Sequence, residues 1–182
     1  MTEATPQGYA VELYFDAQTE KDILDFRESI YQSGVTPVLG KLNDRPHISL
    51  AVFGQHDPKI LVDLSAEFSP HKSRIPIRLE AVGAFPTASN VVFLLPAPSF
   101  ELLQIHRDFH KILEKEKVNS SHYYLPDRWV PHCTIESGLS DDQFDLAVTL
   151  CKRHFTPIGG CLTAVGVIAF RPLDYLAEFP LV

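Results

Sequence analysis

The chain has 182 residues, of which 45% are hydrophobic and 21% are charged, and its formal net charge at neutral pH is −7. These proportions are ordinary for a folded globular protein, and the length suits a single domain, 1–182, with a substantial core. A protein that grips long duplex nucleic acid normally carries a basic stripe, so the acidic balance argues against that class of partner. A small phosphorylated ligand, held by a few local groups, is compatible with it.

The remaining composition predicts a cytoplasmic protein with no membrane partner. The apolar run at 91–95 has only the length of a strand, and residues 1–8 lack the basic and apolar regions of a secretory signal. The three cysteines are odd in number and lack CxxC spacing, so neither a disulfide framework nor a zinc ribbon is expected. We expect a monomer.

The first part of the chain alternates strands and helices. Residues 9–15 mix aromatic and branched side chains and predict a strand. Thr19 predicts the N-cap of a helix that ends before Gly34. A loop then runs to Arg45, and a strand is predicted at 47–53.

A second helix and a hairpin follow. Asp57 and Pro58 have the residue types of an N-cap and a first helical position, and Ser69–Pro70 predicts the end of that helix. Residues 75–85 and 91–95 then predict two strands joined as a hairpin.

The second part of the chain repeats this order. Apolar residues recur at helical spacing within 99–117, and another helix is predicted to begin near Asp141, after a second short strand. Two glycines at 159–160 lead into a predicted strand at 162–170, followed by a last strand-like segment that ends at Val182.

This order predicts an α+β fold of two similar lobes. A histidine-bearing strand followed at once by a helix occurs twice, which indicates a duplicated arrangement. Several strand connections have the length of hairpins, so the sheets should be antiparallel. We therefore expect a bilobal, pseudo-twofold fold in which two antiparallel sheets, backed by helices, face one another across a central cleft.

Two stretches of the sequence, DRPHISL and DRWVPHCTI, share one pattern. Each contains Pro, His, any residue, a hydroxyl residue and an aliphatic residue, with an Asp-Arg pair upstream. Side chains alternate faces along a strand, so His47 and Ser49 share a face, as do His132 and Thr134. One such match would be weak evidence, since a lone strand histidine usually serves structure. Two matches in strand contexts predict a shared site.

Paired imidazoles suit the cleavage or transfer of a phosphodiester. One group must take a proton from the nucleophile, and another must give a proton to the leaving oxygen. Imidazole titrates near ~6.5, so one histidine can be neutral while its partner is protonated. Ser49 and Thr134 would hydrogen-bond the non-bridging phosphate oxygens, where charge accumulates in the transition state. This chemistry requires neither a metal nor a cofactor.

The duplicated H-x-[S/T]-hydrophobic pattern resembles that of the 2H phosphoesterase superfamily. The superfamily includes 2′-5′ RNA ligase-like proteins, also described as RNA 2′,3′-cyclic phosphodiesterases. The resemblance implies a bilobal α+β fold and metal-independent activity on 2′,3′-cyclic or 2′-5′-linked nucleotides. It also implies that His132 is the base in hydrolysis and His47 the acid, although the residues alone leave these two roles open.

Further side chains are candidates for contact with the substrate. Side chains alternate faces along a strand, so residues an even number of positions from a motif histidine share its face. By this rule, called strand parity below, the face of the histidines also carries Arg45, Phe53, Arg128 and Glu136. The arginines would supply positive charge, and a glutamate would contact a sugar hydroxyl or repel a polyanion. Tyr124, like its neighbours Tyr123 and Trp129, is an aromatic residue able to stack on a base.

The sequence leaves alternative functions open. His106 and His110 have the i, i+4 spacing of some metal sites, but they lack an obvious third ligand, so we expect them to flank a helix. The expected activity is hydrolysis of a small nucleotide or an RNA end that carries a 2′,3′-cyclic phosphate. The alternatives are a non-catalytic module that binds a nucleotide monophosphate and a 2′-5′ RNA ligase.

Overall fold

The computed structural model describes residues 5–182. In chain order, its strands and α-helices are β1 (Gly8–Phe15), α1 (Ala17–Gln32), β2 (His47–Phe53), α2 (Pro58–Phe68), β3 (Ile75–Phe85), β4 (Val91–Pro96), α3 (Phe100–Lys115), β5 (Cys133–Glu136), α4 (Asp141–His154), β6 (Ile158–Phe170) and β7 (Asp174–Pro180). Short 3₁₀ turns lie at Leu39–Leu42, Ser69–His71 and His122–Tyr124.

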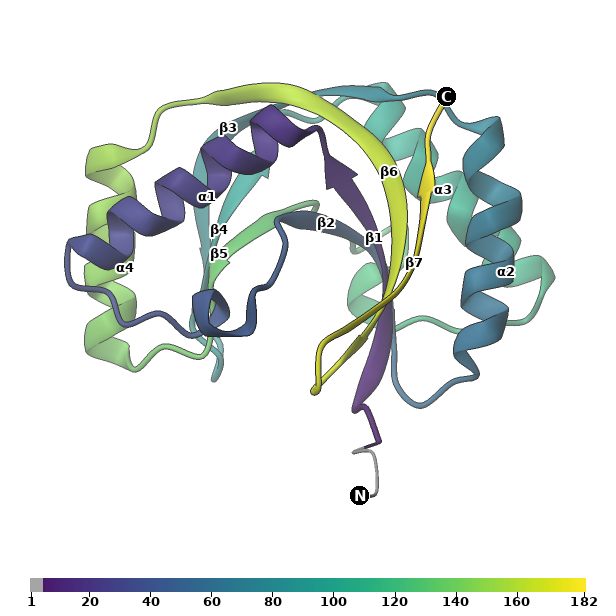
Figure 1. Cartoon of the computed structure of the whole chain (residues 1–182), viewed down its shortest axis with the longest axis horizontal. Coiled ribbons are helices and arrows are strands. Elements are labelled where there is room, and N and C mark those ends of the chain that lie inside the picture. Colours follow the sequence, from purple (N-terminus) through teal and green to yellow (C-terminus); the bar gives the residue numbers. More distant parts are fainter. Residues whose placement is uncertain (1–4) are drawn as a thin grey trace.

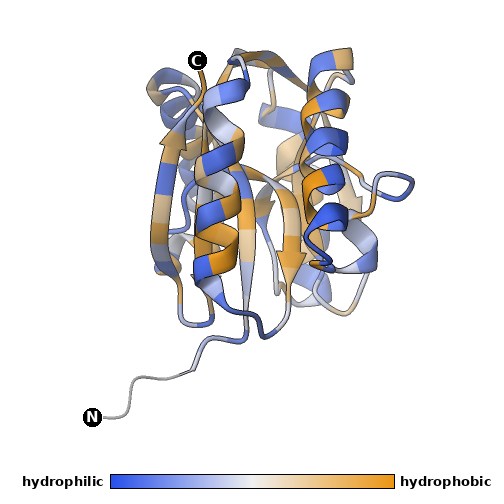
Figure 2. Ribbon diagram, turned by 90° about the vertical axis from the view of Figure 1, so that its right-hand side faces the viewer, coloured by the Kyte–Doolittle hydropathy of each residue, from blue (hydrophilic) through white to orange (hydrophobic). Residues whose placement is uncertain are grey.

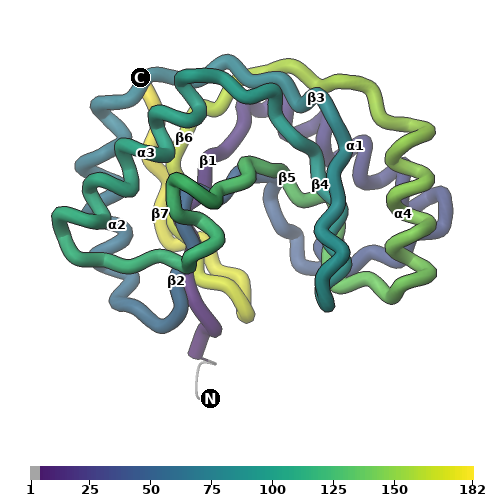
Figure 3. The backbone as a smooth tube through the Cα atoms, turned by 180° about the vertical axis from the view of Figure 1, so that it is seen from behind, coloured from purple at the N-terminus to yellow at the C-terminus, as the bar shows by residue number. Residues whose placement is uncertain are grey.

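The strands form one bent antiparallel sheet. Its order is β2-β1-β6-β3-β4-β5, and β7 pairs with β6. β6 is the long strand that arches over the molecule in Figure 1: its first residues pair with β3, and the rest of the strand pairs with β1 and β7. The bend brings the two edge strands, β2 and β5, into contact near the middle of the molecule, as Figure 3 shows from behind. The two strands that carry the histidine motifs are therefore neighbours.

Strands β1 to β6 and the four α-helices form two β-α-β-α-β units that exchange strands, and β7 follows them. β1-α1-β2-α2-β3 is the first unit, and β4-α3-β5-α4-β6 is the second. The third strand of each unit pairs with the first strand of the other unit, β3 with β4 and β6 with β1. Helices α2 and α3 cover one half of the sheet, and α1 and α4 cover the other (Figure 1). Strand β1 precedes α1 and strand β4 precedes α3, and each of these two helices packs on the half of the sheet that does not contain its preceding strand.

The expected α+β class, antiparallel pairing and duplicated order are confirmed. The expectation of two separate sheets is wrong, because β6 is long enough to pair with strands of both halves. The glycines at 159–160 lie within β6 rather than before it. Helix α1 approaches the sheet so closely there that a Cβ at Gly160 would overlap the Thr19 hydroxyl.

The N-terminus of α2 is capped by the expected residue, whereas that of α1 is capped by a different one. Asp57 and Pro58 open α2 as expected, with Asp57 accepting a hydrogen bond from the Lys59 amide. The N-cap of α1 is Asp16 rather than Thr19: the Asp16 carboxylate accepts hydrogen bonds from the amides of Gln18 and Thr19.

Apolar faces of the helices and strands form the core. Hydrophilic and hydrophobic residues alternate along the helices that face the viewer in Figure 2, and the apolar ones pack on the sheet. No helix within residues 5–182 is long and apolar enough to cross a membrane.

Each histidine strand contains a bulge at the same place in its motif. Leu50 is an extra residue in β2 relative to β1, and Ile135 is an extra residue in β5 relative to β4. Each lies three residues after its histidine. A bulge reverses the alternation of side chains beyond it. Strand parity therefore describes the first residues of each motif but fails for the residues that follow.

Candidate active site

Both motif histidines line one cavity of about 530 Å³. Its lining comes from β2, the end of β3, β4, β5, the 3₁₀ turns at Leu39–Leu42 and His122–Tyr124 and the connecting loops: Leu39, Asp44, His47, Phe85, Thr87, Ser89, Val91, Tyr123, Tyr124, Arg128, Trp129, Val130, His132, Thr134, Ser137 and Arg171. A larger cavity of about 950 Å³ lies between α1, the loop before β2 and β7, and neither histidine lines it. We assign the site to the smaller cavity because it brings the two motifs together.

Each of the two histidines is held by an equivalent hydrogen bond to the backbone, two residues earlier in the chain. His47 Nδ1 donates to the Arg45 carbonyl oxygen at 2.7 Å, and His132 Nδ1 donates to the Val130 carbonyl oxygen, also at 2.7 Å. A proline lies between each histidine and its acceptor. A carbonyl oxygen can only accept, so the proton must be on Nδ1 in both rings. Nε2 is then the nitrogen left for proton transfer.

His132 lies in a largely apolar environment. The rings of Phe85 and Phe93 contact the imidazole, with centroid distances of 5.2 and 5.0 Å. Burial lowers the pKa of His132, and the charge of His47 lowers it further, against the opposing effect of the Val130 carbonyl. His132 is therefore neutral at neutral pH, with a free lone pair on Nε2.

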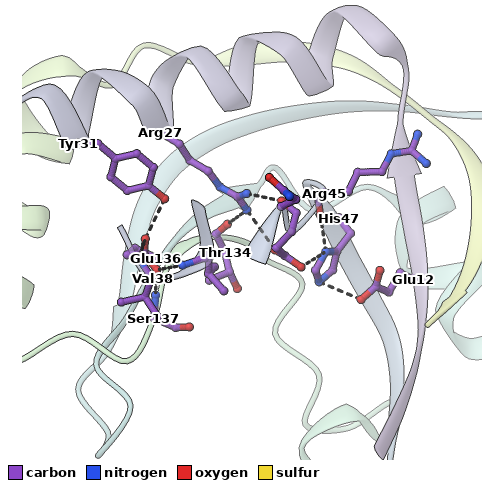
Figure 4. A network of polar contacts seen from close by, with 12 residues as sticks. Glu12, Arg27, Tyr31, Val38, Arg45, His47, Thr134, Glu136 and Ser137 are labelled. Atoms are coloured by element: carbon purple, nitrogen blue, oxygen red, sulfur yellow. Dashed lines mark hydrogen bonds and ion pairs between the residues drawn. The ribbon is translucent and has the colours of Figure 1, made fainter. Parts of the chain in front are cut away.

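His47 lies among carboxylates. Its Nε2 is 3.2 Å from Glu12 Oε1, and its Nδ1 is 4.0 Å from Asp44 Oδ1 (Figure 4). Burial alone would lower the pKa of His47, but these two carboxylates and the Arg45 carbonyl outweigh burial and raise the pKa. The two copies of the motif therefore contain one imidazole with a raised pKa, His47, and one with a lowered pKa, His132.

Arg27 joins the two motifs from α1. Its Nη1 donates to the Asp44 carbonyl oxygen at 2.7 Å, and its Nη2 donates to the Thr134 carbonyl oxygen at 2.6 Å (Figure 4). Nη2 also lies 3.6 Å from Asp44 Oδ2, and the side chain is only 3% exposed. The planar guanidinium holds the segment before His47 against β5.

Glu136 holds the loop before β2 and does not face the cavity. The buried carboxylate accepts hydrogen bonds from the Tyr31 hydroxyl and from the amides of Val38, Leu39 and Ser137 (Figure 4). Because these donors occupy both oxygens, the predicted contact with a sugar or a polyanion is wrong. The bulge at Ile135 explains this result, since it turns the next residue into the protein interior.

Arg45 and Phe53 also lie outside the cavity, against expectation. The Arg45 side chain pairs with Glu20 at 2.7 Å and with Glu178 at 2.8 Å, so two carboxylates hold it away from the histidines. Phe53 is buried in the core, because the bulge at Leu50 reverses the alternation of β2 before that residue.

The other predicted residues are at the site. Thr134, Tyr124 and Arg128 line the cavity, and Arg128 is exposed there. Ser49 is half-buried and does not itself line the cavity, but its side chain lies near Tyr124, which does. Burial raises the pKa of Tyr124, so its hydroxyl keeps its proton. Phosphate binding by Ser49 and Thr134 stays a prediction.

His106 holds the loop that carries the site aromatics, and His110 holds β2 at its bulge. His106 Nε2 donates to the Tyr124 carbonyl oxygen at 2.9 Å, and His110 Nε2 donates to the Leu50 carbonyl oxygen at 3.1 Å. Burial lowers the pKa of His106 to about 3, so this ring is neutral. Its face stacks on Trp129 with a centroid distance of 3.8 Å. Within residues 5–182, no group of three or more His, Cys, Asp and Glu side chains is placed to hold a metal ion.

Trp129 links this loop to the histidine strand β2. Its Nε1 donates to the Ser49 carbonyl oxygen at 3.0 Å. The variant Trp129→Phe keeps an aromatic ring on His106 and removes this hydrogen bond. We expect a loss of about 1 kcal/mol in unfolding free energy and a fall of about 2–4 °C in Tm by calorimetry. Tyr123→Phe, at an exposed ring of the same cavity, is the matched control, and an equal Tm for the two variants would contradict the role of the indole.

Two important residues, Glu12 and Arg27, were missed by the motif analysis. Both left a signal in the sequence. Glu12 is a charged residue in the middle of the strand sequence YAVELYF, and Arg27 takes an inward position of α1, between Ile23 and Ile30. A charge at a position that the pattern assigns to the core is uncommon and indicates a partner.

Comparison with known proteins agrees with the fold and identifies the family. A model of the 2′-5′ RNA ligase superfamily matches residues 18–171. Escherichia coli LigT in complex with 3′-AMP is similar in structure, with 17% identity, a TM-score of 0.67, and coverage of 98% of this chain and 99% of LigT. TT0787 of Thermus thermophilus has 14% identity and a TM-score of 0.64, over 96% of this chain and 97% of its own.

A further structure, described as a phosphoesterase, has 16% identity and a TM-score of 0.66, over 98% of this chain and 99% of its own. A search of curated proteins found no match. The matched family is one of phosphoesterases and ligases, and its model spans both histidine motifs. The chain therefore belongs to the 2′-5′ RNA ligase superfamily, within the 2H phosphoesterases.

Proposed function

We propose that the protein is a metal-independent phosphodiesterase that hydrolyses small 2′,3′-cyclic phosphates, either on nucleotides or on RNA ends. One observation carries the proposal: two histidines with the same backbone hydrogen bond, but opposite pKa shifts, line one cavity. Hydrolysis by two histidines that act as general base and general acid needs one neutral and one protonated imidazole at the same time.

The pKa directions favour His132 as the base and His47 as the acid. His132 Nε2 takes a proton from water as the water oxygen attacks phosphorus. The bond from phosphorus to a ribose oxygen breaks, and His47 Nε2 gives that oxygen its proton. His132 then loses its proton to solvent and His47 regains one. Each of these two proton transfers contributes about 10²–10⁴ in rate.

The cavity favours a small substrate. A volume of about 530 Å³ is within the range of sites for small molecules. Arg128 and Arg171 supply local positive charge for a phosphate, and Tyr123, Tyr124 and Trp129 offer ring faces for a base. LigT, one of the similar structures, is complexed with 3′-AMP, which is a nucleotide of this size. The net charge of −7 disfavours long duplexes. We further propose a monomeric, cytoplasmic protein without a cofactor.

A metal-free screen tests the proposal. The protein is assayed in EDTA against the four ribonucleoside 2′,3′-cyclic phosphates, a 2′-5′-linked dinucleotide and its 3′-5′-linked counterpart, and the products are resolved by chromatography. We expect the cyclic substrates to be opened to monophosphates at a rate that EDTA leaves unchanged. Binding of the nucleotides by calorimetry without any product would contradict an enzyme and favour the nucleotide-binding module.

Ligation is the second candidate activity, because the matched family model describes 2′-5′ RNA ligases. The same pair of histidines would then act on an RNA 5′-hydroxyl in place of water. That hydroxyl loses its proton to the base as it attacks the phosphorus of a 2′,3′-cyclic end, and the 3′ oxygen leaves with a proton from the acid. Incubation of two RNA halves with such ends, followed by gel electrophoresis, would reveal a joined product with a 2′-5′ linkage.

A further inference from the structure

Glu12 is a buried carboxylate at the centre of the sheet. It lies on β1, where its neighbour across to β2 is Ser49. The residue is 1% exposed, and the rest of β1 is buried as well. Removing a charge from water is costly unless the charge is paired. A carboxyl group at this position therefore either takes up a proton or pairs with a cation.

His47 is the group that pairs with Glu12. Glu12 Oε1 lies 3.2 Å from His47 Nε2, the nitrogen that faces away from the Arg45 carbonyl (Figure 4). Glu12 Oε2 has no hydrogen-bond partner among residues 5–182. Both ring nitrogens of His47 thus have an acceptor beside them, and only the doubly protonated ring carries a proton for each.

Glu12 and His47 each shift the pKa of the other. Burial raises the pKa of Glu12 to about 7, although His47 opposes this shift. Burial would lower the pKa of His47, but the Glu12 carboxylate is the largest of the opposing influences, and the pKa is raised. The pair therefore holds at least one proton around neutral pH, and the charge of Glu12 favours its location on His47.

Other groups near the pair have weaker effects. Asp44 reinforces Glu12, and Arg27 opposes it. The remaining titratable or charged side chains that influence this pair or are influenced by it come from β1, the loops, β5 and β7: Tyr14, Arg45, Tyr124, His132, Cys133 and Tyr175. None of these is a carboxylate, so Glu12 and Asp44 are the anions that support an imidazolium.

His132 has no equivalent of Glu12. Within residues 5–182 no carboxylate lies within ion-pair distance of its ring, and phenylalanine rings occupy the nearby space. The two halves of the molecule repeat the same motif and the same bulge, so the histidines differ through their surroundings, in which Glu12 has the largest effect that raises the His47 pKa.

We infer that Glu12 is a positioning residue that keeps His47 protonated and thereby makes His47 the acid and His132 the base. The inference rests on the proposed function for its consequence in catalysis. In the reaction, His47 gives its Nε2 proton to the leaving ribose oxygen and becomes neutral beside the Glu12 carboxylate. A proton from water then restores the ion pair before the next turnover.

Titration of the histidines by NMR tests the inference without any substrate. The chain has eight histidines, and His47→Gln identifies the His47 resonance by its loss. In Glu12→Gln the amide has the shape of the carboxylate without its charge. We expect the pKa of His47 to fall by at least about one pH unit, a tenfold lower ratio of imidazolium to imidazole. Glu178→Gln, which removes an exposed carboxylate that pairs with Arg45, should leave the His47 pKa unchanged.

A second variant and a rate profile complete the test. Glu12→Asp keeps the charge but withdraws it by one methylene, so the His47 pKa should lie between those of the wild type and Glu12→Gln. The alkaline limb of the kcat profile, which follows loss of the His47 proton, should move to lower pH in the same order. The acidic limb, which follows His132, should move less and in the opposite direction, because the charge of His47 is one of the causes that lower the His132 pKa.

The outcomes separate the two proposals. An unchanged His47 pKa and an unchanged alkaline limb in Glu12→Gln, with hydrolysis retained, would overturn the role of Glu12 and leave the proposed function intact. A lower His47 pKa in Glu12→Gln would support the ion pair even if the wild type hydrolysed no cyclic phosphate, and that result would contradict the proposed function alone.

Discussion

Replacing His132 with Ala lowers kcat for a 2′,3′-cyclic nucleotide by a factor of about 10²–10⁴, and replacing His47 with Ala lowers it by a similar factor. The His132 variant loses the group that takes the proton from water, and the His47 variant loses the group that protonates the leaving oxygen. Because the two groups act on one transition state, the double variant should be little worse than either single variant. Steady-state assays in EDTA measure these effects.

The pH dependence distinguishes the two variants. The pKa of His47 is raised and that of His132 is lowered from the ordinary value of 6.5, so wild-type kcat should be greatest at a pH between the two. Residual activity of His47→Ala should lack the alkaline limb, and that of His132→Ala should lack the acidic limb.

The matched control is His154→Ala, at an exposed position at the end of α4 and away from the cavity. This control should retain wild-type kcat, and thermal unfolding should show that all of the variants are folded. Wild-type turnover in both His47→Ala and His132→Ala would refute the two-histidine mechanism.

Replacing Arg27 with Met destabilises the protein by about 3–5 kcal/mol, because it removes one partner from a buried charged network. Met has a comparable length but no donors, so the carbonyls of Asp44 and Thr134 lose their hydrogen bonds and the Asp44 carboxylate loses its nearby cation. The total stability of a domain is only about 5–15 kcal/mol, so the variant would be close to unfolding. Urea denaturation measures the change.

Two further variants define the role of Arg27. Arg27→Lys keeps the charge but lacks the planar fork that bonds both carbonyls, so it should recover only part of the lost stability. Arg153→Met, at an exposed position of α4, controls for the loss of an arginine and should change stability by less than about 0.5 kcal/mol. A loss below about 1 kcal/mol in Arg27→Met would contradict a structural link between the two motifs.

Local chemistry in the sequence predicts much of this structure. The residues of β2, 47–53, and the Asp57 cap of α2 are as expected, because each depends on neighbouring residues alone. The pairing of His47 with His132 across one cavity is also as expected, since the repeated motif identifies both.

Long-range pairing explains what the sequence does not reveal. The bulges at Leu50 and Ile135 arise from register with β1 and β4, and they send Phe53 and Glu136 into the interior. The partners of Glu12 and Arg27 are likewise distant along the chain. A lone charge in an apolar pattern indicates that a partner exists, but only the fold identifies the partner.

The exchange of third strands makes each half of the molecule incomplete without the other. A β-α-β-α-β unit on its own leaves its first strand open on one side, where β3 or β6 of the other unit pairs, and leaves its third strand without the partner that the other unit supplies. Two copies of one such unit would complete each other as a strand-swapped homodimer, with one histidine motif from each subunit. Fusion of those copies would give a chain of this topology, and only then can a residue such as Glu12 make one histidine differ from the other. The fold therefore accounts for the similar placement of the two histidines, and its single chain allows their surroundings to differ.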